Sequence, residues 1–186
     1  MSTLPPKATS VTVEGHPDGW TLPRSFRAQV APDGTTRLVV SVPSDALAAT
    51  HLALLDALDG PWSVRYLKLT DRKTGQLQKP ETWVRMDAKP DLVRTAFRER
   101  PALVWHDGRH QLWVRGKMGD TVVLDELGVL YCYPDDPAFR AALGDLPESK
   151  ETGMDGRDYV RVELLSDADE QEQSLIPALA LQALKT

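Results

Sequence analysis

Hydrophobic and polar positions alternate along most of the chain, in short runs that turn residues separate. The runs at 25–30 and 36–42 flank Pro32-Asp33-Gly34, and an Asp-Gly step between alternating runs is a strong signal for a β-hairpin. The same pattern predicts a second hairpin from runs at 62–69 and 76–86. A longer meander is expected further on, with strands at 103–106, 109–115, 121–125 and 129–133. The sequence therefore predicts a largely antiparallel sheet.

Each hairpin is followed by a segment with helical features. Apolar residues recur at helical spacing within 44–58, which predicts an amphipathic helix capped by Ser44. A second helix is expected over 90–98, and a third begins with Asp136 as N-cap and Pro137 at the first helical position. Short helices after each hairpin of an antiparallel sheet indicate an α+β fold, with the helices mainly on one face.

The final third of the chain predicts a loop, a strand and a helix. Residues 146–158 are polar and contain two glycines, which is typical of a surface loop. After the strand, Ser166 and Asp169 have the spacing of a capping box for the final helix. Its apolar residues, Leu175 and Leu179 among them, cover too much of the circumference for one face of a small core. We expect this helix to lie in a groove of its own domain or to be covered by another chain.

One main domain with a short appended element is expected from a length of 186 residues. The α+β domain is predicted over 1–145, the polar loop over 146–158, and the C-terminal strand and helix over 159–186, packed on the main domain or on a partner. Cys132, the single cysteine, lies in an apolar run, which predicts a buried thiol and a reducing, cytoplasmic compartment. The longest apolar stretch, 175–184, is shorter than the ~20 residues that a membrane helix needs, so we expect no membrane partner.

Charge is distributed unevenly, and this changes the expectation about partners. The formal net charge is −5, yet residues 61–117 carry 13 Lys/Arg and 6 Asp/Glu, whereas 118–186 carry 5 and 15. The middle of the chain therefore has a net charge of +7 and the end one of −10. Such asymmetry concerns surfaces and steering rather than fold. It favours an outside partner for the basic middle, or an acidic end that folds back on it.

A repeated Trp and Arg pair is the main candidate for a binding surface. Alternate residues of a strand point to the same side, so each Trp of Trp83-Val84-Arg85 and Trp113-Val114-Arg115 shares a face with its Arg. The repetition predicts that Trp83, Arg85, Trp113 and Arg115 all lie on one accessible face of the sheet.

Our leading hypothesis is a non-enzymatic protein-binding or assembly module. The basic Trp/Arg face and the apolar terminal helix, through Leu175 and Leu179, would contact another protein or a second copy of the chain. The alternative is a protein that binds single-stranded nucleic acid, whose indoles stack on bases and whose guanidinium groups contact phosphates.

Candidate catalytic residues are few. His106 and His110 flank Asp107-Gly108, and if that step is a two-residue turn, their imidazoles lie on opposite faces of the hairpin. A second alternative is nevertheless a small hydrolase with a site near His106 and His110. The sequence has no phosphate loop, nucleophile elbow, zinc-ligand spacing or dinucleotide fingerprint. It thus favours binding over catalysis, and we expect no catalytic residues, no metal and no cofactor.

Overall fold

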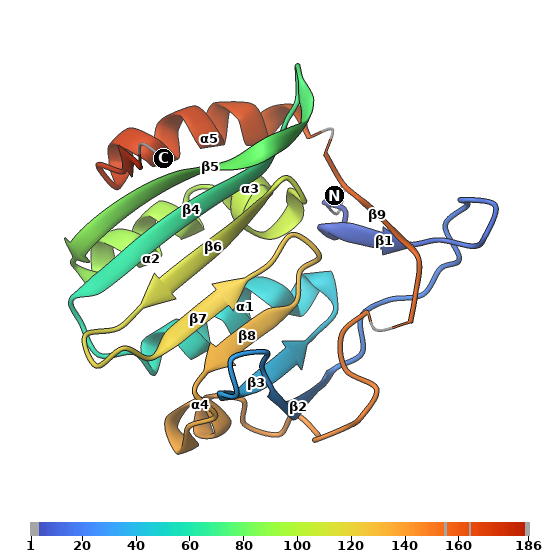
Figure 1. Cartoon of the computed structure of the whole chain (residues 1–186), viewed down its shortest axis with the longest axis horizontal. Helices are drawn as coiled ribbons and strands as arrows, with labels where there is room; N and C mark the ends of the chain where they lie inside the picture. The colour runs from blue at the N-terminus through green and yellow to red at the C-terminus, as the bar shows by residue number, and fades with distance from the viewer. Residues whose placement is uncertain (1–3, 155, 164, 185–186) are drawn as a thin grey trace.

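A large antiparallel sheet with helices on one face organises the chain. The computed structural model describes residues 4–154, 156–163 and 165–184. Eight strands form one sheet in the order β10-β5-β4-β6-β7-β8-β3-β2, with antiparallel neighbours throughout. In Figure 1 the helices α1, α2 and α3 lie behind this sheet, and α5 follows its upper edge. The predicted α+β fold with a largely antiparallel sheet is confirmed.

The strands follow the predicted hairpins closely. Those of the large sheet are β2 (Ser25–Val30), β3 (Thr36–Ser41), β4 (Trp62–Asp71), β5 (Gly75–Ala88), β6 (His110–Arg115), β7 (Thr121–Leu124), β8 (Leu130–Tyr133) and β10 (Gln182–Ala183). A second sheet pairs β1 (Ala8–Ser10) with β9 (Tyr159–Arg161). This small sheet brings the N-terminal segment against the part of the chain that precedes α5 (Figure 1).

Helix starts show where local sequence rules apply. The helices are α1 (Ser44–Asp56), α2 (Pro90–Arg98), α3 (Pro101–His106), α4 (Pro137–Ala142) and α5 (Ser166–Ala178). Asp136 caps α4 as predicted, because its carboxylate accepts a hydrogen bond of 2.7 Å from the amide of Ala138. The caps predicted at Ser44 and Ser166 are wrong, since each serine is already the first helical residue and its helix has no side-chain cap.

Residues 103–106 belong to helix α3 and not to the strand that the sequence predicts. Pro101 fits the first turn of a helix, where its missing amide donor costs no hydrogen bond. A short apolar run is compatible with either structure, because periodicity alone does not separate a buried helix from a buried strand. Asp107-Gly108 is consequently no hairpin turn. Gly108 instead allows close packing, since a Cβ there would lie 2.5 Å from the carbonyl oxygen of Lys7.

The core lies between the helices and the side of the sheet that they cover. It includes large side chains from the sheet and from several helices, such as Trp62, Tyr66, Phe97 and Phe139. No helix among the residues that the structure describes is long and apolar enough to cross a membrane.

Helix α5 contributes to this same core. Leu175 and Leu179 are fully buried there, and Gln171 of α5 accepts a hydrogen bond of 2.9 Å from the amide of Leu103 in α3. Of the two arrangements expected for this helix, the structure has the groove in its own domain. Leu175 and Leu179 are therefore not exposed to a partner, and the expectation that they form a docking surface is wrong.

Candidate functional site

The strand register places the first Trp-Arg pair on the helix-covered side of the sheet. Trp83 of β5 lies opposite Tyr66 of β4, and Arg85 lies opposite Val64. Tyr66 and Val64 are both buried in the core, and residues directly opposite each other share a face. The Nε atom of Arg85 is buried and has no hydrogen-bond partner among the described residues.

The second pair lies on the other side. Trp113 of β6 is opposite Arg65 of β4, and Arg115 is opposite Ser63. Trp83 and Arg85 thus do not share a face with Trp113 and Arg115, and the expectation of one four-residue surface is wrong. Alternation within a strand determines which of its residues share a side. The register between strands determines which residues of neighbouring strands share a side, and the two Trp-Val-Arg sequences do not encode that register.

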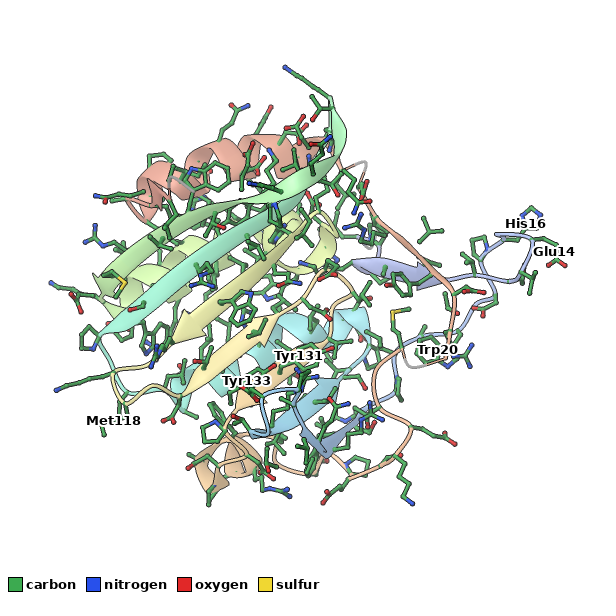
Figure 2. The ribbon with its side chains drawn as sticks, viewed as in Figure 1. Glu14, His16, Trp20, Met118, Tyr131 and Tyr133 are labelled. Atoms are coloured by element: carbon green, nitrogen blue, oxygen red, sulfur yellow. The ribbon has the colours of Figure 1, made fainter. Side chains whose placement is uncertain are left out.

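We use the name open face for the side of the large sheet that no helix covers, although Val39 and Val123 on this side are buried. A row of mutually opposite residues crosses it from β3 to β4: Val39, Tyr131, Val123, Trp113 and Arg65. By alternation, the face also holds Arg37, Tyr133 and Arg115. Figure 2 shows Tyr131 and Tyr133 side by side in front of β8, on the side away from the helices.

Arginines of the open face stack on aromatic rings. The guanidinium carbon of Arg37 lies 4.5 Å from the ring centre of Tyr131 and 5.5 Å from that of Tyr133. That of Arg65 lies 5.8 Å from the ring centre of Trp113. Contacts of this kind orient the planar cation, which loses less freedom when it later binds a ligand.

Three arginines of the open face form no ion pair with a described residue. Within the described parts of the chain, Arg37, Arg65 and Arg115 make no ion pair, and Arg37 donates only to the neutral side chains of Gln29 and Tyr133. Many other arginines are paired with carboxylates: Arg24 with Asp145, Arg94 with Asp56, Arg140 with Asp135, and Arg157 with Asp18. The open face therefore holds three arginines without an ion pair among the described residues.

No family model, curated protein or solved structure matches this chain. The chemistry of the site must consequently be inferred from its own residues.

Acidic side chains of α5 neutralise a different part of the basic middle. Asp169 lies 3.0 Å from Arg72 and 2.8 Å from Arg109, and Glu172 lies 3.3 Å from Lys68. The fold-back of the acidic end that the charge pattern allowed is thus present at the edge beside α5. Arg37, Arg65 and Arg115 remain without an ion pair among the described residues.

A buried polar cluster occupies the end of the sheet beside β1. The guanidinium group of Arg109 donates to both carboxylate oxygens of Asp107, from Nε to Oδ1 at 3.0 Å and from Nη2 to Oδ2 at 2.5 Å. The ammonium group of Lys7 points to the carbonyl oxygens of Val104 and His110, at 3.5 and 3.4 Å. Burial lowers the pKa of Lys7 to about 8, against the opposing attraction of Asp107 and other carboxylates. This cluster ties the N-terminal segment to α3 and β6.

His106 and His110 contact different parts of the molecule and form no common site. The Nδ1 atom of His106 lies 2.6 Å from the carbonyl oxygen of Pro5. His110 is fully buried against Tyr66, with 5.0 Å between the ring centres, and neither of its ring nitrogens has a partner among the described residues. No group of three or more His, Cys, Asp and Glu side chains in the described ranges can hold a metal ion.

Two buried histidines are neutral in the native state. Burial, followed by the charge of Lys7, lowers the pKa of His51 to about 3, and the same two causes lower the pKa of His110 well below its usual range. Trp105 donates a hydrogen bond of 3.1 Å to Nδ1 of His51, which fixes that nitrogen as an acceptor. Asp125 is affected in the opposite direction, since burial and the neighbouring Glu126 raise its pKa to about 7.

These groups predict a pH-dependent stability. Below pH 6.5, His51 and His110 take up protons in the unfolded chain but not in the native chain. The free energy of unfolding should therefore decrease as the pH is lowered. Between about pH 7 and 4, Asp125 takes up a proton in the native chain before it does so in the unfolded chain. This effect stabilises the native state and offsets the loss of stability from one of the two histidines. In urea titrations at pH 6 and 5, His110→Leu should reduce this slope by about 1.4 kcal/mol per pH unit. Equal slopes for the two proteins would contradict the buried, neutral state of His110.

The residues that sequence reasoning missed are Arg37, Arg65, Tyr131 and Tyr133. Each lies in a strand that the hydrophobic pattern predicted with nearly correct bounds. Their alternation with buried neighbours such as Cys132 was a usable signal for which side each strand buries. What the sequence did not reveal is that these residues are neighbours. Their proximity depends on the pairing of β3 with β8, two strands that are far apart in the sequence.

Proposed function

We propose that this chain is a protein-binding module whose open face recognises a partner segment that bears exposed carboxylates. The observation that carries the proposal is the state of Arg37, Arg65 and Arg115, which lie on an uncovered sheet face without an ion pair within the described residues. A charged partner with the opposite sign is the simplest complement of such a surface.

The chemistry of the guanidinium group favours carboxylates. Stacking occupies the flat side of a guanidinium and leaves its N–H edge directed outward, where a carboxylate accepts two parallel hydrogen bonds. Arg65 is exposed and has the indole of Trp113 beside it, which is the geometry that such a contact needs.

Apolar side chains on the same side support a protein partner. Val84 lies opposite Arg65, and Met86, two residues further along β5, is 63% exposed. Protein interfaces combine a dry, apolar part with arginine and aromatic residues, and methionine adapts to many partner shapes. The open face offers both components within neighbouring strands.

Single-stranded nucleic acid is a less well supported ligand. Base binding needs free aromatic faces, whereas Arg37 and Arg65 already lie against the rings of Tyr131 and Trp113. Trp83 and Arg85, which the nucleic-acid hypothesis also required, lie on the covered side.

A binding experiment with defined polymers tests this proposal. Labelled poly-L-glutamate should bind the chain at low salt, and Arg65→Gln with Arg115→Gln should weaken its binding about tenfold or more, as two charge-assisted contacts are lost. Arg98→Gln, an exposed arginine of α2 on the covered side, is the matched control and should leave the affinity unchanged. Fluorescence anisotropy measures both, with oligothymidylate as competitor. Equal losses in the control, or binding of oligothymidylate alone, would contradict the proposal.

A further inference from the structure

A cavity of about 190 Å³ lies at one end of the open face, over β3 and β8. The lining residues include Arg27 and Gln29 of the edge strand β2, Arg37 of β3, Tyr131 of β8, Met154 from the segment before β9, and Tyr159 of β9 itself. This volume is below the 300–1,000 Å³ that is usual for small-molecule pockets. It suits one side chain rather than a whole cofactor.

Arg27 and Arg37 both line this cavity, and Arg37 is the cation that stacks on the ring of Tyr131. Its Nε and Nη2 atoms donate to the Oε1 atom of Gln29 at 3.0 and 2.7 Å, and Nη1 donates to the hydroxyl of Tyr133. These three contacts leave two of the five N–H groups of a guanidinium available. Both acceptors are uncharged groups, and Arg37 forms no ion pair with a described residue.

The ring of Tyr131 lies beside a buried acidic group. Burial, followed by the nearby carboxyl group of Asp125, raises the pKa of the Tyr131 phenol. The Oδ1 atom of Asp125 accepts hydrogen bonds from the amides of Leu127 and Val129 at 2.9 and 2.8 Å. Arg37 stacks on the ring of Tyr131 and donates to Gln29, and these two contacts position the cation before any ligand arrives.

We propose that this cavity is a binding site for one carboxylate, supplied by an acidic side chain of the protein partner. Arg37 is the residue that contacts the carboxylate, and Gln29 and Tyr131 are positioning residues that hold its guanidinium group. This inference rests on the proposed function and deepens it, since it assigns one contact of the partner to a defined place on the open face.

A titration with sodium glutarate, a small dicarboxylate, tests the cavity without the partner. In ¹H–¹⁵N spectra of the full chain, the Nε–Hε signal of Arg37 and the amide signals of Tyr131 and Gly153 should shift and saturate together. Arg37→Gln should weaken this binding about tenfold or more, whereas Arg65→Gln, outside the cavity, should leave it unchanged. Shifts without saturation, or tighter binding of inorganic phosphate at the same place, would overturn the carboxylate site.

The same variants separate this inference from the proposed function. If poly-L-glutamate binds and Arg37→Gln leaves its affinity unchanged, the open face is a recognition surface and the cavity is not part of it. If glutarate binds in the cavity while poly-L-glutamate does not bind at all, the carboxylate site stands and the proposed partner class is wrong. Gln29→Leu offers a second variant, which should weaken glutarate binding less than Arg37→Gln while leaving the charge of the site intact.

Discussion

Leu175→Asp is expected to unfold helix α5 and to remove most of the stability of the chain. The side chain of Leu175 is fully buried in the core that α3, α5 and the sheet share. Loss of a buried leucine costs about 2–5 kcal/mol, and an unpaired buried carboxylate adds several more, against a usual stability of roughly 5–15 kcal/mol. Urea denaturation followed by circular dichroism measures this loss.

Two further variants make that prediction specific. Leu175→Ala should lower the free energy of unfolding by about 2–5 kcal/mol without changing the oligomeric state, because the side chain contacts its own domain. Gln173→Asp, exposed on the same helix, should change stability by less than about 0.5 kcal/mol. An unchanged urea midpoint for Leu175→Asp would show that α5 does not pack as the structure has it.

Asp107→Asn is the second substitution with a large expected effect. The carboxylate of Asp107 accepts hydrogen bonds from the guanidinium group of Arg109 and also from the Arg109 amide at 2.8 Å, with both side chains almost completely buried. Removing one partner of a buried ion pair typically costs about 3–5 kcal/mol. Because Asp169 still lies 2.8 Å from Arg109 in the variant, we expect a loss near the lower end of that range.

Asp169→Asn provides the comparison for Asp107→Asn. Asp169 binds the same guanidinium group at 2.8 Å, but its side chain is 35% exposed, so water compensates for its loss. The expected cost is about 1 kcal/mol or less. Thermal unfolding of the two variants in one buffer measures the difference. Equal losses would contradict the view that Asp107 is the carboxylate on which the buried position of Arg109 depends.

The sequence predicted elements better than it predicted their mutual arrangement. Alternation found the strands, and the Asp136-Pro137 step found the start of α4, because both signals are local. The order of strands in the sheet depends on contacts between distant segments, such as β3 with β8, which no local pattern encodes. The fold class was therefore accessible, while the faces of individual strands in the assembled sheet were not.

The candidate site illustrates that division. Trp113 and Arg115 lie on the open face as expected, whereas Trp83 and Arg85 lie on the covered side because of the β4–β5 register. The alternation of Arg65 with buried Val64 and Tyr66 was visible in the sequence, but its position beside Trp113 follows only from the pairing of β4 with β6. The register of one strand pair is thus enough to move two of four predicted surface residues to the covered side of the sheet.

The charge pattern was informative in a different way. It suggested that the acidic end either leaves the basic middle open to a partner or neutralises it. The structure does both in separate places: Asp169 and Glu172 pair with cations beside α5, and Arg65 and Arg115 stay unpaired on the open face within the described residues. The net charge of a segment does not show which side of the sheet each charged residue occupies, because alternate residues of a strand lie on opposite sides.

Charge reversal on the open face tests the central claim most directly. In Arg65→Glu with Arg115→Glu, fluorescence anisotropy should show loss of poly-L-glutamate binding and tighter binding of poly-L-lysine than the unmodified chain has. The thermal unfolding temperature should be nearly unchanged because both positions are exposed. If the variant instead binds poly-L-glutamate as the unmodified chain does, the open face is not the surface that recognises carboxylates.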